Sequence, residues 1–210
     1  MKALALAQTD AAHGKLPADK QLAIRDTIGE IVDDLADHAD EPLEAKEGQP
    51  ASPQIPILAS EQRRPEWQVD YPVLCIASRS PLDEAAAIML AQLLEKHGLP
   101  AKIQPFADAA SARSLKIDAR DAPLVCLSYF GAVRNPAHVR FLIRRLKRTM
   151  PKAKFLAGYW MLGENPEKGE DWKDAVGAHF VATSLADAVA LCIREASVAA
   201  SVHRIPAPVA

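Results

Sequence analysis

Short apolar runs alternate with segments of helical periodicity through the second half of this sequence. Residues 72–77 (PVLCIA) and 123–128 (PLVCLS) carry no charged side chain, and such runs are typical of strands that are buried on both faces of a parallel sheet. Residues 81–97 and 136–150 place their apolar side chains three and four positions apart, as amphipathic helices do. Strands that are separated by helices predict parallel pairing through right-handed crossovers.

Five strands and the helices between them are predicted for this region. The capping signals Ser80-Pro81-Leu82-Asp83 and Ser184-Leu185-Ala186-Asp187 mark two helix starts. The strands are expected at 72–77, 101–106, 123–128, 153–160 and 179–183, and helices at 81–97, 107–115, 136–150, 172–178 and 184–199. The predicted fold is an α/β, flavodoxin-like three-layer α/β/α sandwich, whose five-stranded parallel sheet has the order 2-1-3-4-5.

Four regions follow from changes in composition along the chain. Residues 1–40 are expected to form two helices, which must pack on the later domain or on a partner to be stable. Residues 41–70 contain Pro50, Pro53, Pro56 and Pro65, and predict a flexible linker. Residues 71–200 are the α/β domain, and residues 201–210 form a loose tail.

Composition excludes several classes of protein. Of the 210 residues, 49% are hydrophobic and 25% are charged, which is enough apolar material for a core. The net charge of −2 gives no reason to expect a nucleic-acid binder. No apolar run is long enough for a membrane span, and the first ten residues make no convincing signal peptide, so we expect a cytoplasmic location. Cys75, Cys126 and Cys192 lie in apolar segments and are expected to be buried free thiols.

The motifs of common α/β enzymes are missing. Neither G-x-G-x-x-G nor G-x-S-x-G occurs at the predicted strand ends, and no H-E-x-x-H or other close histidine pair is present. The acidic residues of a phosphoacceptor site are replaced by Ala77, Ser78 and Ser128. We therefore expect no catalytic residues, no metal site and no enzymatic activity.

Ligands of such sheets bind beyond the carboxyl ends of the strands. Ser80 is either a plain helix N-cap or part of an anion site with Arg79. Tyr159 and Trp160 either form an aromatic wall for a ligand or fill the gap under a loop. The candidate ligand-binding residues at this edge are Ser78, Arg79, Ser80, Ser128, Tyr129, Gly158, Tyr159, Trp160 and Thr183.

A basic face is predicted on the helix at 136–150, where Arg140, Arg144, Lys147 and Arg148 point away from the apolar stripe. Such a face is either simply solvated or a docking surface. Its partner would be anionic lipid head groups or the acidic segment at 26–47.

The α/β domain resembles cobalamin-binding-type domains. Ser128 stands in place of that family's S-x-L serine, Ala157-Gly158 in place of its Gly-Gly pair, and residues 176–189 are similar to its G-A-D-x-x-A stretch and last helix. The family's D-x-H-x-x-G motif supplies the imidazole that binds cobalt. Here the corresponding loop, residues 78–83 (SRSPLD), has no histidine, and nothing nearby replaces it. Cobalamin is therefore not expected, and no other cofactor is predicted.

A second resemblance covers nearly the whole chain. Residues 3–8 (ALALAQ), 30–38 (EIVDDLADH), 72–77 (PVLCIA) and 81–86 (PLDEAA) resemble the cytosolic C-terminal extension of some permeases of the autoinducer-2 exporter (AI-2E) family. This resemblance implies association with a membrane permease domain, at the inner face of the cell membrane. The expected function is a non-catalytic regulatory or ligand-sensing domain, with an anionic small molecule as one ligand class. The alternative is a small-molecule or corrinoid carrier of an enzyme system.

Overall fold

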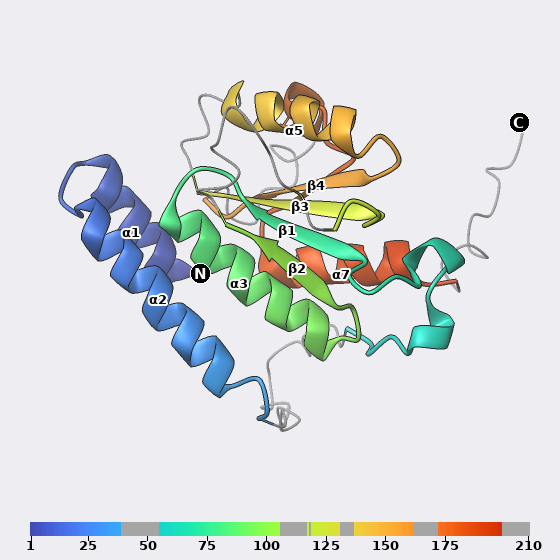
Figure 1. The fold of residues 1–210 in the computed structure, drawn as a ribbon. Helices are drawn as coiled ribbons and strands as arrows, with labels where there is room; N and C mark the ends of the chain where they lie inside the picture. Colours follow the sequence, from blue (N-terminus) through green and yellow to red (C-terminus); the bar gives the residue numbers. More distant parts are fainter. Residues whose placement is uncertain (39–54, 106–116, 118, 131–136, 162–171, 199–210) are drawn as a thin grey trace, which may run out of the picture.

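The five predicted strands form one parallel sheet in the predicted order, β2-β1-β3-β4-β5 (Figure 1). The computed structural model describes residues 1–38, 55–105, 117, 119–130, 137–161 and 172–198. The strands are β1 (Val73–Ala77), β2 (Ala101–Gln104), β3 (Leu124–Tyr129), β4 (Lys154–Tyr159) and β5 (Phe180–Ala182). Every residue of β1 and β3 is buried, which explains why their sequences lack polar alternation.

Helices cover both faces of the sheet, as the three-layer prediction requires (Figure 1). Helix α3 (Pro81–Lys96) and helix α7 (Leu185–Ala196) pack on one face, and α5 (Ala137–Thr149) packs on the other. Both predicted caps are present, because Ser80 Oγ and Ser184 Oγ accept hydrogen bonds from the backbone N–H groups of Asp83 and Asp187. Residues 172–176 are helical, as expected.

The two N-terminal helices pack on the α/β domain. Helix α1 (Lys2–Ala12) is followed by Gly14, which has a φ of +71°, and by α2 (Ala18–Asp34). Helix α2 lies along α3. Arg25 forms an ion pair with the buried Glu84 over 3.4 Å, and the Gln92 amide donates to the Val32 carbonyl over 2.9 Å. Of the two expected arrangements, packing on the later domain is the one observed.

The prediction of a flexible linker is wrong for residues 55–70. This segment contains two short 3₁₀ helices, η1 (Ser60–Gln62) and η2 (Pro65–Trp67). Leu58 and Trp67 are buried in the core, and the Arg64 N–H donates to the Ala196 carbonyl over 2.8 Å. The prolines gave the appearance of a linker because they exclude regular helices and strands, but they do not exclude burial of the apolar side chains between them.

Several expectations lie outside the described residues. These are the linker at 41–54, the short helix at 107–115 and the tail at 201–210. Cys75, Cys126 and Cys192 are free and buried, as predicted. Among the described residues, no helix combines the length and the apolar character that crossing a bilayer requires.

Candidate functional site

Strand register brings the predicted ligand-binding residues to one edge of the sheet. Ser128 of β3 pairs with Ala77 of β1 on one side and with Gly158 of β4 on the other, and Gly158 pairs with Ala182 of β5. Because all strands are parallel, the residues that follow them meet at the carboxyl edge. Ser78 and Ser128 flank the switch point between β1 and β3, and their backbones are joined where the Ser78 N–H donates to the Ser128 carbonyl.

The loop after β1 is held by a buried carboxylate. Oδ2 of Asp83 accepts hydrogen bonds from the N–H groups of Arg79 and Ser80 over 2.9 and 3.0 Å. Oδ1 accepts a third bond, of 2.7 Å, from the N–H of Phe130 in the loop after β3. Burial raises the pKa of the Asp83 carboxyl from 3.8 to about 6, even though these N–H groups favour its charged form.

The hydrogen bonds of Asp83 leave few free N–H groups for an anion at the start of α3. Ser80 is the N-cap, and Asp83 already occupies two of the loop N–H groups that an anion would need. An incoming phosphate or carboxylate would have to displace the protein's own carboxylate. The charged group of this loop that an anion could meet is the exposed Arg79, whose guanidinium also interacts with the Tyr129 hydroxyl.

The aromatic side chains after β4 fill the protein interior. The Tyr159 ring makes an edge contact with Tyr129 and a tilted contact with Trp172, with ring centres 5.5 and 4.6 Å apart. The Trp160 indole lies over Gly158, so closely that a Cβ at residue 158 would come within 2.2 Å of it. Both rings are buried, so of the two expected roles the gap-filling one is observed for the rings themselves.

Four polar atoms at this edge are buried but make no hydrogen bond to the described residues. The hydroxyls of Ser78, Ser128 and Tyr159 and the indole N–H of Trp160 are buried without a hydrogen-bond partner among the described residues. Ser128 is fully buried, and Tyr159 is 1% exposed. Burial of a polar group without a partner costs about 1–3 kcal/mol, so four such groups along one edge require an explanation. Sequence reasoning selected these residues by position and gave no sign that they would lack partners.

A histidine that sequence reasoning missed lies beside the same loop. Nε2 of His138, in the first turn of α5, is 2.8 Å from the carbonyl oxygen of Ser78. The loop itself has no histidine, as the sequence shows, but the fold brings the imidazole of His138 to it. The two residues are 60 positions apart, and no sequence motif connects them.

The residues of this edge do not fit a cobalamin. The loop from Ser78 to Asp83 supplies no imidazole, and Nε2 of His138 is engaged by a backbone carbonyl. The space above Gly158 is filled by Trp160. We therefore assign no role to a corrinoid in this chain. Among the residues that the structure describes, no three His, Cys, Asp or Glu side chains are grouped as a metal site would need.

The remaining predicted residues lie at or near the surface. Thr183 follows β5 and is half-buried. Arg140, Arg144, Lys147 and Arg148 are exposed on α5, as predicted. Lys147 is partly structural, because its Nζ donates to the Gly177 carbonyl over 2.8 Å and lies 5.9 Å from the centre of the Phe155 ring.

Comparison with solved structures shows a similarity to a cobalamin-binding protein. A cobalamin-binding protein from Desulfitobacterium hafniense DCB-2 is similar to this chain, with a TM-score of 0.44 and 14% sequence identity. The similarity covers 90% of this chain and 76% of that one. No family model and no curated protein matches the sequence. The α/β fold itself follows from the order and register of the sheet.

Proposed function

We propose that this chain is a non-catalytic domain that binds a small polar molecule at the carboxyl edge of its sheet. The observation that carries the proposal is a set of four buried polar atoms at this edge, on Ser78, Ser128, Tyr159 and Trp160, which have no hydrogen-bond partner in the part of the chain that the structure describes. They lie at the strand ends where sheets of this order bind their ligands. A ligand that offers donors and acceptors to them would remove the cost of leaving them unpaired.

The chemistry of these groups favours an uncharged ligand. Three hydroxyls can each donate and accept, and the indole N–H donates only. None of the four is charged, and Asp83 holds the N–H groups that would otherwise bind an anion. A molecule with several hydroxyl and ring-nitrogen groups, such as a nucleoside, fits better than a phosphate. An anionic ligand would depend on Arg79 at the surface of the site.

The first test replaces the Tyr159 hydroxyl, which has no partner among the described residues, and the Tyr129 hydroxyl, which has a charged neighbour. Tyr159→Phe should raise the melting temperature of the ligand-free chain, because the buried hydroxyl costs stability and the ring packing is kept. Tyr129→Phe is the matched control, because the Tyr129 hydroxyl has a hydrogen-bonding interaction with the Arg79 guanidinium, which the Tyr159 hydroxyl lacks among the described residues. If Tyr159→Phe lowers the melting temperature, that hydroxyl has a partner in solution and the proposal fails.

The second test measures binding. The full chain is titrated with adenosine, with adenosine monophosphate and with hydroxocobalamin, and binding is followed by calorimetry and by gel filtration. We expect adenosine to bind more tightly than the monophosphate, and Ser128→Ala to weaken its binding. Thr149→Ala, an exposed hydroxyl at the far end of α5, should leave it unchanged. Retention of hydroxocobalamin would favour the carrier alternative.

A regulatory role beside a membrane permease of the AI-2E family is a finer form of this proposal, and its support is the sequence resemblance. It places the domain in the cytoplasm, at the inner face of the membrane. Transport by an intact permease with and without the segment that corresponds to residues 71–200 tests it. Unchanged transport and unchanged regulation would count against the role.

A further inference from the structure

Helix α2 presents an apolar surface that nothing in the described structure covers. The 11-residue α1 is shorter than the 17-residue α2, so the second half of α2 extends past the start of α1. Ile31 in that half is 51% exposed, and Leu35, which caps the C-terminus of α2, is 46% exposed. These two residues belong to a groove of about 310 Å³ that is lined by side chains of α1, α2 and α3, among them Leu4, Ile28, Ile31, Leu35, Met89 and Leu93.

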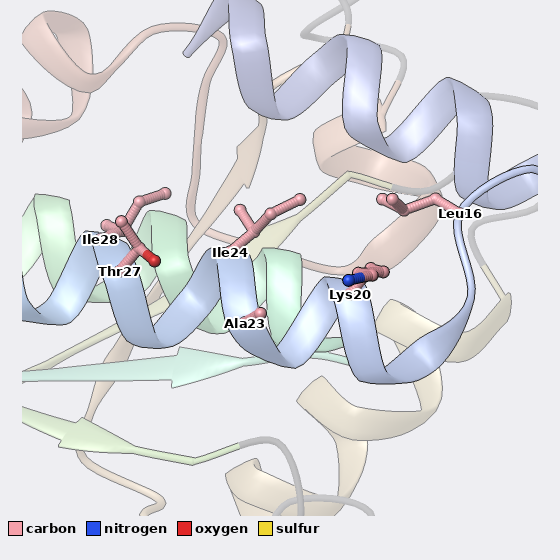
Figure 2. Close-up of a pocket in the computed structure, with 6 residues that line it drawn as sticks. All are labelled: Leu16, Lys20, Ala23, Ile24, Thr27 and Ile28. Carbon is pink, nitrogen blue, oxygen red and sulfur yellow. The ribbon is translucent and has the colours of Figure 1, made fainter.

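The groove continues toward the α1–α2 turn. A second hollow lies between α1 and α2, where Ile24 and Ile28 of α2 point toward α1 (Figure 2). Ile28 lines both hollows. Together the two hollows form a depression along α2 with a mainly apolar lining, and such patches mark interaction sites. We call it the α2 groove.

The edge of the α2 groove is acidic. Glu30, Asp33, Asp34 and Asp37 are exposed at the C-terminal end of α2 and just beyond it. No ion pair within the described part of the chain involves their side chains. A partner for this groove should therefore combine an apolar side chain with positive charge.

Helix α5 has that combination on the opposite side of the molecule. Phe141 is 61% exposed, although its ring is fully apolar. At helical spacing Arg144, Arg145 and Arg148 follow it by three, four and seven residues, which places them on the same side of the helix as Phe141. The helix contains no acidic residue. Helices α2 and α5 lie on opposite sides of the sheet, so one copy cannot bring its own two surfaces together (Figure 1).

We propose that α5 of one copy of this chain docks in the α2 groove of a second copy, with Phe141 against Ile31 and Leu35 and the arginines against the acids of α2. One contact then accounts for both exposed apolar surfaces and for their opposite charges. Because the two surfaces lie on opposite sides of the sheet, two copies cannot make this contact twice at the same time. The contact is therefore head-to-tail, and it produces a ring or an open chain of copies rather than a symmetric dimer. The charged edge makes the association salt-sensitive, since the Debye length is about 10 Å at 0.1 M salt.

The test uses the full chain and two sets of surface variants. The α5 variants are Phe141→Ser and the pair Arg144→Glu with Arg148→Glu, and the groove variant is Ile31→Ser with Leu35→Ser. The controls are Arg194→Glu, an exposed arginine of α7, and Ile57→Ser, which changes a 73% exposed apolar residue. Circular dichroism and melting temperature show which variants are folded, and sedimentation gives the mass of each species.

The wild-type chain should form species larger than a dimer at low salt and dissociate at high salt. Each α5 variant and the groove variant should be monomeric, and both controls should behave as the wild type does. An equimolar mixture of Phe141→Ser, which keeps its groove, and the groove variant, which keeps α5, should give a one-to-one complex that does not grow further.

Three results would overturn the proposal. A wild-type chain that stays monomeric at low salt would do so, and so would an α5 variant that assembles normally. A mixture of the two single-surface variants that stays monomeric would exclude the head-to-tail contact. Binding of a monomeric wild type to phosphatidylglycerol vesicles, lost in the α5 variants and absent with phosphatidylcholine, would assign α5 to a membrane surface instead.

Discussion

Asp83 and Phe130 connect the two loops that flank the switch point of the sheet. Oδ1 of Asp83 accepts a 2.7 Å hydrogen bond from the Phe130 N–H, while Oδ2 binds the loop after β1. One buried carboxylate thus fixes the spacing between the ends of β1 and β3. Ser78 and Ser128 lie at those strand ends, so this carboxylate also holds the candidate site in place.

The pKa of Asp83 predicts a pH dependence of stability. Because the folded-state pKa is raised to about 6 from 3.8, the folded chain holds its proton more tightly than the unfolded chain. The stabilisation is complete below pH 4 and is lost as the pH rises through 6. A shift of this size corresponds to roughly 3 kcal/mol. The stability advantage of the wild type over Asp83→Asn, measured by urea unfolding, should therefore shrink from pH 4 to 7. If the stability advantage of the wild type instead grows from pH 4 to 7, the Asp83 carboxyl is ionised in the folded chain and its pKa is not raised.

Gly158 should not tolerate a side chain. A methyl group at residue 158 would meet the Trp160 indole at 2.2 Å, so Gly158→Ala must displace the ring. We expect a loss of about 1–3 kcal/mol, with a change in tryptophan fluorescence. Gly29→Ala is the control, because its Cβ would have open space within α2. That change should stabilise the chain by about 0.5–1 kcal/mol, and equal effects of the two substitutions would contradict the model of Trp160 packing.

Trp67 tests whether residues 55–70 belong to the folded unit. Its indole is buried in the core cluster with Leu58, so Trp67→Ala should cost about 3–5 kcal/mol in the free energy of unfolding. Ile57→Ala, ten residues earlier and largely exposed, should change it by less than about 0.5 kcal/mol. A similar small effect of both substitutions would restore the linker interpretation.

The three thiols should be unreactive in the native chain. Cys126 and Cys192 have their sulfur atoms 3.8 Å apart, and Cys75 is buried beside them. Hydrogen bonding to the neighbouring thiols, together with burial, raises the pKa of Cys126 and suppresses the reactive thiolate. Ellman's reagent should find no thiol before unfolding and three afterwards in guanidinium. Rapid reaction of one thiol in the native chain would show that this part of the core opens.

Local signals determined most of the architecture. The apolar runs at 72–77 and 123–128 predicted buried parallel strands, and Ser80 with Asp83 predicted a helix start, because both depend on residues that are neighbours in the sequence. The alternation of these strands with helices predicted parallel pairing, and the flavodoxin-like arrangement that it favours gave the order of the strands. The positions of the candidate residues at the carboxyl edge followed in turn. The main error, at residues 55–70, came from treating prolines as evidence against burial.

The tertiary structure decided what those positions can do. Three features of the site depend on atoms from separate elements. They are the lack of a described partner for the Tyr159 hydroxyl, the contact of His138 with the Ser78 carbonyl, and the packing of Trp160 over Gly158. The same is true of the bond from Phe130 to Asp83, which joins residues 47 positions apart. A sequence pattern records the periodicity of neighbours along one element, whereas these contacts are set by how side chains from different elements fill a shared volume.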